Sequence, residues 1–221
     1  MTGSGSEPGD DAVEDRLTLA DWRRRVAALY VEVRAMSVVD PALALTHWRV
    51  TREWLYREHP QSPIPMDARA AFRARHFDHD PRLRFQAVLE PAPPPAPGAL
   101  TLDLPNSGAD SLAFRRVGIV RLAFPEGERI LSVFWLAGYA GGLFIPFRDA
   151  TNGTETYDAG RYLLDAAKSA DLGSDTATRT LTLDANFAYQ PSCAFDPRWA
   201  CPLAPPENRL DIAVRAGERL T

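Results

Sequence analysis

The sequence predicts an α+β protein in which an N-terminal helical pair is followed by a predominantly antiparallel β-barrel or β-sandwich. Two observations lead to this class. Apolar residues near the N-terminus recur at steps of three and four, as on one face of a helix, whereas from residue 82 onward they alternate with polar residues. Short turn signals separate the later runs, which is typical of antiparallel sheets rather than of βαβ units.

The composition is that of an ordinary globular protein. The chain has 221 residues, of which 45% are hydrophobic and 24% are charged. The net charge of −4 does not favour a nucleic-acid partner, and no apolar run reaches the roughly 18 residues of a membrane span. The N-terminus is acidic and lacks the pattern of a secretory signal, so we expect a cytoplasmic protein. Nothing in the sequence indicates a cofactor.

The periodicity divides the chain into three parts. Residues 1–16 have the composition of a disordered tail, residues 17–60 contain the helices, and residues 61–221 form the β-rich main domain. The proline-rich stretch 91–98 must be an extended connector, because proline cannot donate to a strand ladder. The strand-like runs of the main domain are 82–90, 99–104, 112–124, 129–137, 143–147, 153–158, 160–166, 179–189 and 209–216.

The first helix is predicted over 19–36. Three consecutive arginines, 23–25, favour either a solvated helix face or an anionic partner. Beside them runs an apolar stripe, which is also a candidate homodimer contact. The stripe consists of Leu19, Trp22, Val26, Leu29, Val33 and Met36.

The second helix begins at Asp40-Pro41, a capping residue followed by proline in the first turn, and must end before Pro60. It is apolar on two sides, so we expect it to be covered on two sides. One face carries Leu45, Trp48 and Leu55, and the other carries Leu43, Val50 and Trp54.

The segment FIPFRDATNGTETYDAGRYLLDA contains many of the polar side chains that could form a site. Asn152-Gly153 is a strong hairpin signal, and Asp149 beside it could close Asx-type hydrogen bonds without any ligand. A buried Arg161 would need a carboxylate, and the candidates are Glu155, Asp149 and Asp184. Such a pair could fix the core, or it could grip an anionic or hydroxylated ligand.

The run RTLTLDANFAY is the clearest strand of the sequence. Asp184 and Asn186 are poor strand formers, so their presence indicates a cavity or a supporting network. Glu207 and Asn208 end the loop that follows. They could hydrogen-bond to backbone amides of the turn, or they could point into the same polar cluster as Asp184 and Arg161.

Both cysteines, Cys193 and Cys201, lie in one proline-rich loop. No histidine is near them in sequence, which disfavours a zinc site and a nucleophilic thiol. Buried thiols that pack the loop are the simplest explanation, and a disulfide across the loop stays open. We predict no metal site here.

These motifs resemble the bacterial and archaeal domain-of-unknown-function family 1684. The resemblance covers roughly residues 45–219 and rests mainly on GGLFIPFRDATNGTETYDAGRYL, LDANFAYQPSCAFDPRWACPLAPPENRL and VRAGER. It implies a β-rich body behind an N-terminal helix, and it implies no activity. The family motif positions are Arg148, Asp149, Glu155, Thr156, Tyr157, Gly160, Arg161, Tyr162, Asp184, Asn186, Tyr189, Cys193, Cys201, Glu207 and Asn208.

Three functions are compatible with these residues. In a metal-independent hydrolase or lyase, Glu155, Asp184 or Glu207 would act as general base. In a structural or partner-binding module, the polar residues would form a buried network. In the leading hypothesis, the domain binds a small polar or anionic ligand, with Arg161 neutralising its charge. The candidate ligand-binding residues are Arg148, Asp149, Glu155, Tyr157, Arg161, Tyr162, Asp184, Asn186, Tyr189, Glu207 and Asn208.

Overall fold

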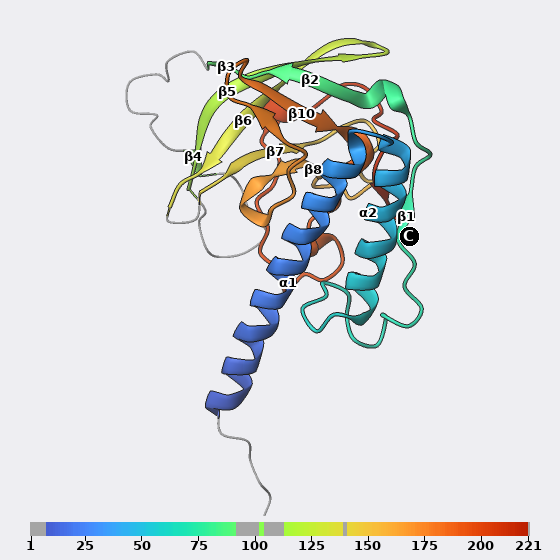
Figure 1. Ribbon diagram of the computed structural model, residues 1–221, viewed down its shortest axis with the longest axis vertical. Coiled ribbons are helices and arrows are strands. Elements are labelled where there is room, and N and C mark those ends of the chain that lie inside the picture. Colours follow the sequence, from blue (N-terminus) through green and yellow to red (C-terminus); the bar gives the residue numbers. More distant parts are fainter. Residues whose placement is uncertain (1–7, 92–101, 104–112, 139–140, 221) are drawn as a thin grey trace, which may run out of the picture.

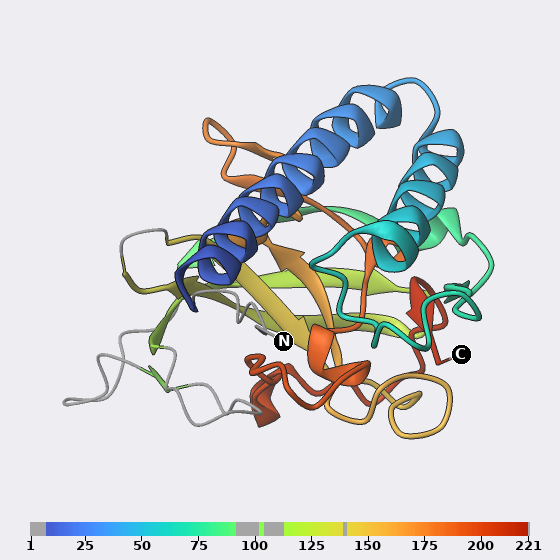
Figure 2. The same ribbon diagram turned by 90° about the horizontal axis from the view of Figure 1, so that it is seen from below.

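Two helices lie on one side of a β-rich body in the computed structural model, which describes residues 8–91, 102–103, 113–138 and 141–220 (Figures 1 and 2). Helix α1 spans Pro8–Ser37 and helix α2 spans Pro41–Glu58. The sequence predicts a disordered tail over 1–16, but residues 8–16 form the first turns of α1. The predicted first helix therefore begins earlier than its apolar stripe, at a proline that suits the first turn.

The start and end of α2 are those that the sequence predicts. The Asp40 carboxylate accepts hydrogen bonds from the backbone N–H groups of Ala42 and Leu43, each at 3.0 Å. These bonds satisfy two donors that have no partner within the helix. The helix ends at Glu58, before Pro60.

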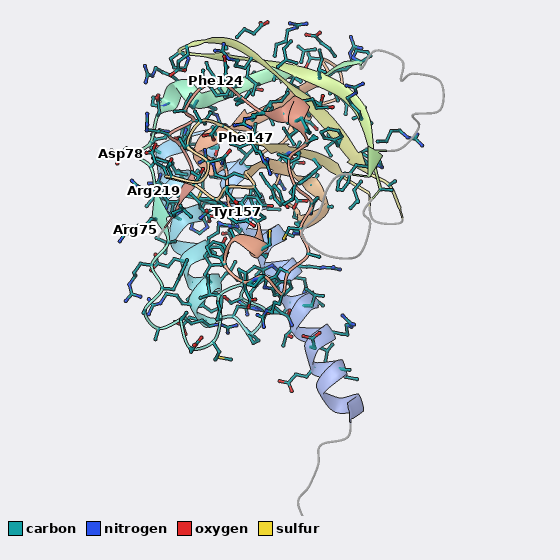
Figure 3. All side chains as sticks on the ribbon, turned by 180° about the vertical axis from the view of Figure 1, so that it is seen from behind. Arg75, Asp78, Phe124, Phe147, Tyr157 and Arg219 are labelled. Carbon is teal, nitrogen blue, oxygen red and sulfur yellow. The ribbon has the colours of Figure 1, made fainter. Side chains whose placement is uncertain are left out.

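The strands form three antiparallel sheets. The largest has the order β3 (Glu90–Pro91), β5 (Ala113–Phe124), β6 (Gly127–Leu136), β7 (Leu143–Phe147) and β8 (Arg161–Asp165), and β4 (Leu102–Asp103) also pairs with β5. A second sheet has the order β2 (Arg84–Val88), β10 (Thr180–Asp184) and β9 (Ser174–Asp175). The third consists of β1 (Arg75–His76) and β11 (Glu218–Arg219), near one edge of the molecule, where Figure 3 labels Arg75 and Arg219.

The described strands do not form a closed barrel. The sheets pack as a sandwich around an apolar core, so the predicted α+β class with a sandwich-like body is confirmed. The core draws residues from both larger sheets, including Phe85 and Leu183 from one and Phe124 and Phe147 from the other. Figure 3 labels the last two.

Two predicted strands are not strands in the structure. Residues 153–158 form turns, because Asn152 and its neighbours hydrogen-bond one another within the loop. Residues 209–216 run without a ladder. Their carbonyl groups are taken by other partners: the Ala150 N–H donates to Ile212, and the Arg161 guanidinium donates to Val214.

The predicted strand 179–189 is shorter than expected. It ends at Asp184, whose carboxylate accepts a hydrogen bond from the Asn186 N–H at 2.9 Å and so caps a 3₁₀ turn over Ala185–Phe187. The two poor strand formers therefore mark the end of the strand. The predicted connector 91–98 lies outside the described residues, apart from Pro91 in β3.

The apolar stripe of α1 packs inside the chain. Val26, Leu29 and Val33 are 0–8% exposed and join a second core with α2 and the β body. These three members of the stripe are therefore covered by residues of the same chain, whereas Leu19, Trp22 and Met36 are half-buried. We expect the second apolar face of α2 to be covered, but the described residues leave it open. Its members are 45–66% exposed, namely Leu43, Val50 and Trp54.

Candidate functional site

A cavity of about 490 Å³ lies between the two helices and the proline-rich loop. Helix α1, helix α2 and four loop segments contribute to its wall. The lining residues are mostly apolar or aromatic, with a few polar groups among them. They are Leu19, Trp22, Arg23, Val26, Arg52, Tyr56, Gln61, Pro63, Ala167, Lys168, Ser169, Ala170, Tyr189, Gln190, Pro191, Ser192, Trp199, Ala200 and Cys201.

An ion pair between Arg52 of α2 and Glu218 of β11 lies at the buried end of this cavity. The Arg52 Nε donates to the Glu218 Oε1 at 2.9 Å, and the two side chains are 9% and 3% exposed. The Arg52 Nη2 donates to the Tyr56 hydroxyl, which also lies 3.3 Å from the Glu218 Oε1. The third nitrogen, Nη1, has no hydrogen-bond partner among the described residues.

Aromatic rings surround the Arg52 guanidinium. Its central carbon lies 4.9 Å from the ring centres of Trp48 and Tyr56 and 4.5 Å from that of Tyr189. Burial by itself would lower the pKa of Arg52, but Glu218 and the neighbouring tyrosines raise it above its ordinary value. The group is therefore a permanent cation held in a fixed orientation by rings and by one carboxylate.

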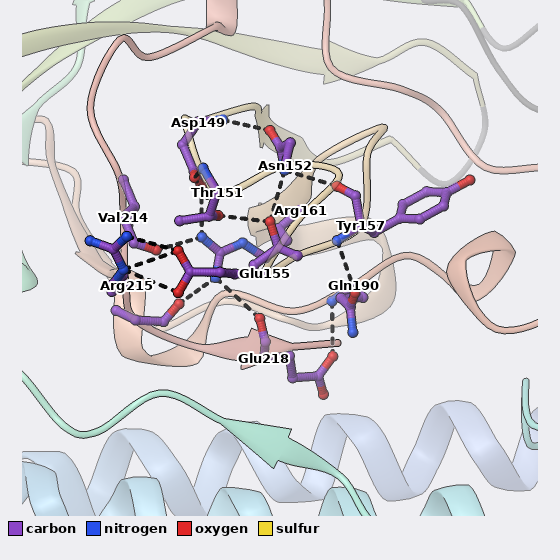
Figure 4. Close-up of polar contacts among 12 residues, drawn as sticks. Asp149, Thr151, Asn152, Glu155, Tyr157, Arg161, Gln190, Val214, Arg215 and Glu218 are labelled. Atoms are coloured by element: carbon purple, nitrogen blue, oxygen red, sulfur yellow. Dashed lines mark hydrogen bonds and ion pairs between the residues drawn. The ribbon is translucent and has the colours of Figure 1, made fainter. Parts of the chain in front are cut away.

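We call the Arg52–Glu218 ion pair the floor of the cavity. Glu218 and Gln190 connect this floor to the β body through hydrogen bonds. The second Glu218 oxygen accepts from the Gln190 N–H at 2.9 Å. The Gln190 amide oxygen accepts from the Tyr157 N–H at 3.2 Å, and its Nε2 donates to the Arg219 carbonyl at 3.1 Å. Figure 4 shows Gln190 between Tyr157 and Glu218. The loop after β7 thus supports the cavity floor through one amide side chain.

The Arg161 guanidinium lies behind this floor and is completely buried. Its Nη2 donates to the Asp149 carboxylate and to the Val214 carbonyl, both at 2.7 Å, and its Nη1 donates to the Glu218 carbonyl at 3.1 Å (Figure 4). Another bond goes to the Ala216 carbonyl. Burial lowers the pKa of Arg161, opposed by the attraction of Asp149.

The turn after β7 has the Asx geometry that the sequence allows. The Asp149 carboxylate accepts from the Thr151 N–H at 2.7 Å, and the Asp149 N–H donates to the Asn152 side chain. At the end of this loop, Gly160 has a φ of +103°, and an added Cβ would lie 2.4 Å from the Phe147 carbonyl oxygen. A side chain at that position would both strain the backbone and clash.

Asp184 and Asn186 belong to another network. The Asp184 carboxylate accepts from Arg84 at 3.1 Å and from the Asn186 side chain at 2.8 Å. The Asn186 amide in turn bonds both backbone groups of Asp80, at 2.9 and 2.8 Å. Burial raises the pKa of Asp184, opposed by its bonds to Asn186 and Arg84. These residues fasten the chain ahead of β2 onto the end of β10.

Asn208 has a comparable role, and Glu207 beside it does not. The completely buried Asn208 amide bonds both backbone groups of Ser132 and the Pro146 carbonyl, at 2.7–3.0 Å. Glu207 is an exposed residue whose carboxylate lies 3.5 Å from Arg116. Asn208 therefore fixes the end of the proline-rich loop to strands β6 and β7.

The remaining charged candidates lie near the surface. The Glu155 carboxylate pairs with Arg215, with the closest atoms 2.9 Å apart, and this hydrogen-bonded partner lowers the pKa of Glu155. The Arg148 Nε donates to the Ala159 carbonyl at 3.3 Å. Neither residue lines the cavity.

Two of the tyrosine candidates, Tyr162 and Tyr189, and both cysteines lie at or next to the cavity wall. The Tyr162 hydroxyl donates to the Pro202 carbonyl at 2.6 Å, and the Tyr189 hydroxyl donates to Asp165 at 3.1 Å. Both cysteines are buried thiols, and the Cys193 N–H lies 3.4 Å from the Cys201 Sγ. A hydrogen bond with Cys193, together with burial, raises the pKa of Cys201 far above its ordinary value.

The structure brings only two of the sequence candidates onto the cavity wall, Tyr189 and Cys201. Arg161 pairs with Asp149, one of its three predicted carboxylates, but it faces backbone carbonyls and not the cavity. The single polar cluster that the sequence suggests is instead divided among the networks described above. The motif residues support the cavity more than they line it.

Sequence reasoning missed the charged floor. Arg52 lies on the predicted buried face of α2, between Trp48 and Leu55, and an arginine in an apolar stripe is a sign of a buried ion pair. Glu218 carries no such sign, because its short strand shows no alternation. Lys168 and the aromatic wall residues Trp22 and Trp199 also gave no pattern that points to a common site.

The described part of the chain contains no group of three or more His, Cys, Asp or Glu side chains that could hold a metal ion. Within the same residues, neither helix combines the length and the apolar character that crossing a membrane requires.

Comparison with known proteins identifies a family and similar solved structures. A model of the family described as "Protein of unknown function (DUF1684)" matches residues 71–219. The solution NMR structure of an uncharacterised protein from Haloarcula marismortui is 32% identical and covers 84% of this chain and 97% of its own, with a TM-score of 0.61. No curated protein matches the chain.

Proposed function

The chain belongs to the DUF1684 family of proteins of unknown function, and we propose that it binds a small molecule in the cavity between its helices and its proline-rich loop. The ligand has an apolar body and at least one polar group. The observation that carries the proposal is Arg52, a buried cation on the cavity wall with one nitrogen that has no partner among the described residues.

The size and lining of the cavity support this function. Small-molecule sites are typically concavities of 300–1,000 Å³ with apolar walls and a few convergent polar groups. The cavity has a volume of about 490 Å³, and Trp22, Pro191 and Trp199 supply apolar parts of the wall to which Arg52 also belongs. A ligand of moderate size would be largely enclosed.

The rigidity of the floor also favours binding. Arg52 is fixed by Glu218, and Glu218 is fixed by the Gln190 N–H and by the strand that carries it. The prolines of the loop restrict the backbone on the opposite wall. A site that is already ordered loses little conformational entropy when a ligand enters.

The alternative of a hydrolase or lyase receives less support from this geometry. Its three candidate bases, Glu155, Asp184 and Glu207, lie outside the cavity, and no Asp or Glu is among the described residues that line it. The structural-module alternative accounts for the networks of Asp149, Asn186 and Asn208, but it gives no role to the unpartnered Arg52 nitrogen.

The test is a fragment screen by ligand-observed NMR on the full chain and on one cavity-blocking variant. Ala167→Trp places an indole on an exposed residue of the cavity wall. Ala177→Trp makes the same change on an exposed residue that does not line the cavity, and it serves as the matched control.

We expect a set of fragments that bind the wild-type chain and the control but not Ala167→Trp. In spectra of ¹⁵N-labelled protein, the same fragments should shift the indole N–H signals of Trp22 and Trp199. Fragments that bind all three proteins equally, or a screen without binders, would overturn the proposal.

A further inference from the structure

We propose that the ligand is a carboxylate with an apolar body, and that its single negative charge is recognised by the Nη1 group of Arg52. This inference rests on the proposed function and specifies the chemistry of the same site. It follows from the charges on the cavity wall, from the hydrogen bonds that Arg52 already makes, and from the position of the other cations.

The cavity presents cations and no carboxylate. Three of its described lining residues are basic, namely Arg23, Arg52 and Lys168, and none is acidic. The carboxylates that compensate them lie behind the wall: Glu218 pairs with Arg52, and Asp165 lies 3.9 Å from Lys168. A ligand inside the cavity therefore meets positive charge directly, which favours an anion over a neutral or cationic group.

The hydrogen bonds of Arg52 leave one place for that anion. Nε and Nη2 are taken by Glu218 and Tyr56, so the bidentate edge that they form is not available to a ligand. Nη1 is not among the buried polar atoms that lack a partner, so it retains contact with the cavity space. Nη1 is part of the guanidinium cation of Arg52, a residue that is 7% exposed, so a hydrogen bond that it donates is charge-assisted and poorly screened.

A carboxylate fits this donor better than a phosphate does. Arg52 and Glu218 together carry no net charge, so the floor offers the two N–H groups of Nη1 and little surplus positive potential. A phosphate dianion needs several donors and more than one cation close by, whereas one carboxylate oxygen is satisfied by Nη1.

Lys168 and Arg23 lie nearer the solvent and have a weaker role. The Lys168 side chain is 57% exposed, and Arg23 is an exposed residue of α1. Exposed charges attract an anion over a longer range, but salt screens them. They should therefore increase the association rate and make the affinity dependent on salt, while Arg52 sets the orientation of the head group.

The experiment compares acids with their uncharged isosteres. The probes are phenylacetate, 4-phenylbutanoate and octanoate, each with its primary amide, and benzylphosphonate as a dianionic counterpart of phenylacetate. Affinities are measured by NMR titration of the full chain. One charge-assisted hydrogen bond predicts that each acid that binds does so about ten- to a hundredfold more tightly than its amide.

Three variants locate the charge. Arg52→Lys keeps the cation but not the Nη1 geometry, and it should remove most of the preference for acids. Arg23→Gln should weaken acids about two- to threefold in low salt. Arg24→Gln is the matched control, because it removes the same charge from an exposed neighbour that does not line the cavity, and it should have no effect on affinity.

A measurement on the wild-type chain guards against a variant that does not fold. In protein labelled with ¹⁵N-arginine, the side-chain signals of Arg52 should shift on adding an acid and stay in place on adding its amide.

If acids and amides bind equally in the cavity, the proposed function stands and the carboxylate assignment is wrong. If benzylphosphonate binds more tightly than phenylacetate, or the Arg52 signals do not move, the assignment is also wrong. If neither acids nor amides bind, both proposals fail.

Discussion

Replacing Asp149 by Asn should destabilise the protein far more than the corresponding change at Glu155. Both residues lie in the loop after β7 and both pair with an arginine. The Asp149 and Arg161 side chains are each 0% exposed, whereas Glu155 is 29% and Arg215 63% exposed. The comparison therefore changes burial while it keeps the chemistry of the pair.

The expected magnitude at Asp149 follows from its contacts. Its Oδ2 accepts from the Arg161 Nη2 at 2.7 Å, and its Oδ1 accepts from the Thr151 N–H at 2.7 Å. An asparagine can keep one of these acceptors, but it leaves the Arg161 cation without a counter-charge in the core. Removing one partner of a buried ion pair costs about 3–5 kcal/mol. Glu155→Gln breaks a solvent-exposed pair and should cost less than about 1 kcal/mol.

The assay is urea unfolding at neutral pH, followed by tryptophan fluorescence and by far-ultraviolet circular dichroism. The two variants should differ by at least about 2 kcal/mol in free energy of unfolding. If they cost the same within about 0.5 kcal/mol, the Arg161 network does not have the role in the core that its geometry indicates.

Three further predictions concern stability and reactivity. Burial lowers the pKa of His76 to about 4 from 6.5, so the unfolded chain binds a proton more readily than the folded chain between these values, and stability is lost as the pH falls through this window. Between about pH 7 and pH 4.5, the free energy of unfolding of His76→Gln, measured with urea, should fall by about 2 kcal/mol less than that of the wild-type chain. An unchanged pH dependence would contradict this. Asn208→Ala leaves three backbone groups without the hydrogen-bond partner that Asn208 provides, and it should lower the free energy of unfolding by about 2–4 kcal/mol in the same assay. Glu207→Gln, beside it, should change stability by less than about 0.5 kcal/mol. The Cys193 and Cys201 thiols should react with a disulfide reagent roughly a hundredfold more slowly in the folded protein than in denaturant, and rapid labelling without unfolding would show that the loop opens.

The local features of the fold could be predicted because their causes are local. Asp40-Pro41 starts α2, since the cap and the proline act within one turn of the chain. The alternation of apolar residues identifies most strands, since it reflects which side of the sheet each residue faces. The Asx bonds of Asp149 also depend on neighbours in sequence.

Contacts between distant segments could not be predicted in this way. Residues 209–216 have the alternation of a strand, but Arg161, more than fifty residues earlier, takes the carbonyls that a strand would use. Asp149 is one of the three carboxylates predicted as partners of Arg161, yet nothing in the sequence shows that the pair faces the backbone instead of a cavity. The direction of a side chain depends on what packs around it.

Periodicity, capping and motifs are enough to predict the class of the protein, its helical pair, most of its strands and its family. The position of the cavity that we propose as a binding site is defined only once the chain is folded. Arg52 and Glu218 are 166 residues apart, and the wall around them comes from segments spread over most of the chain. The physical reason is that periodicity and capping act over one turn or one strand, whereas a cavity exists only where packed elements leave a space between them.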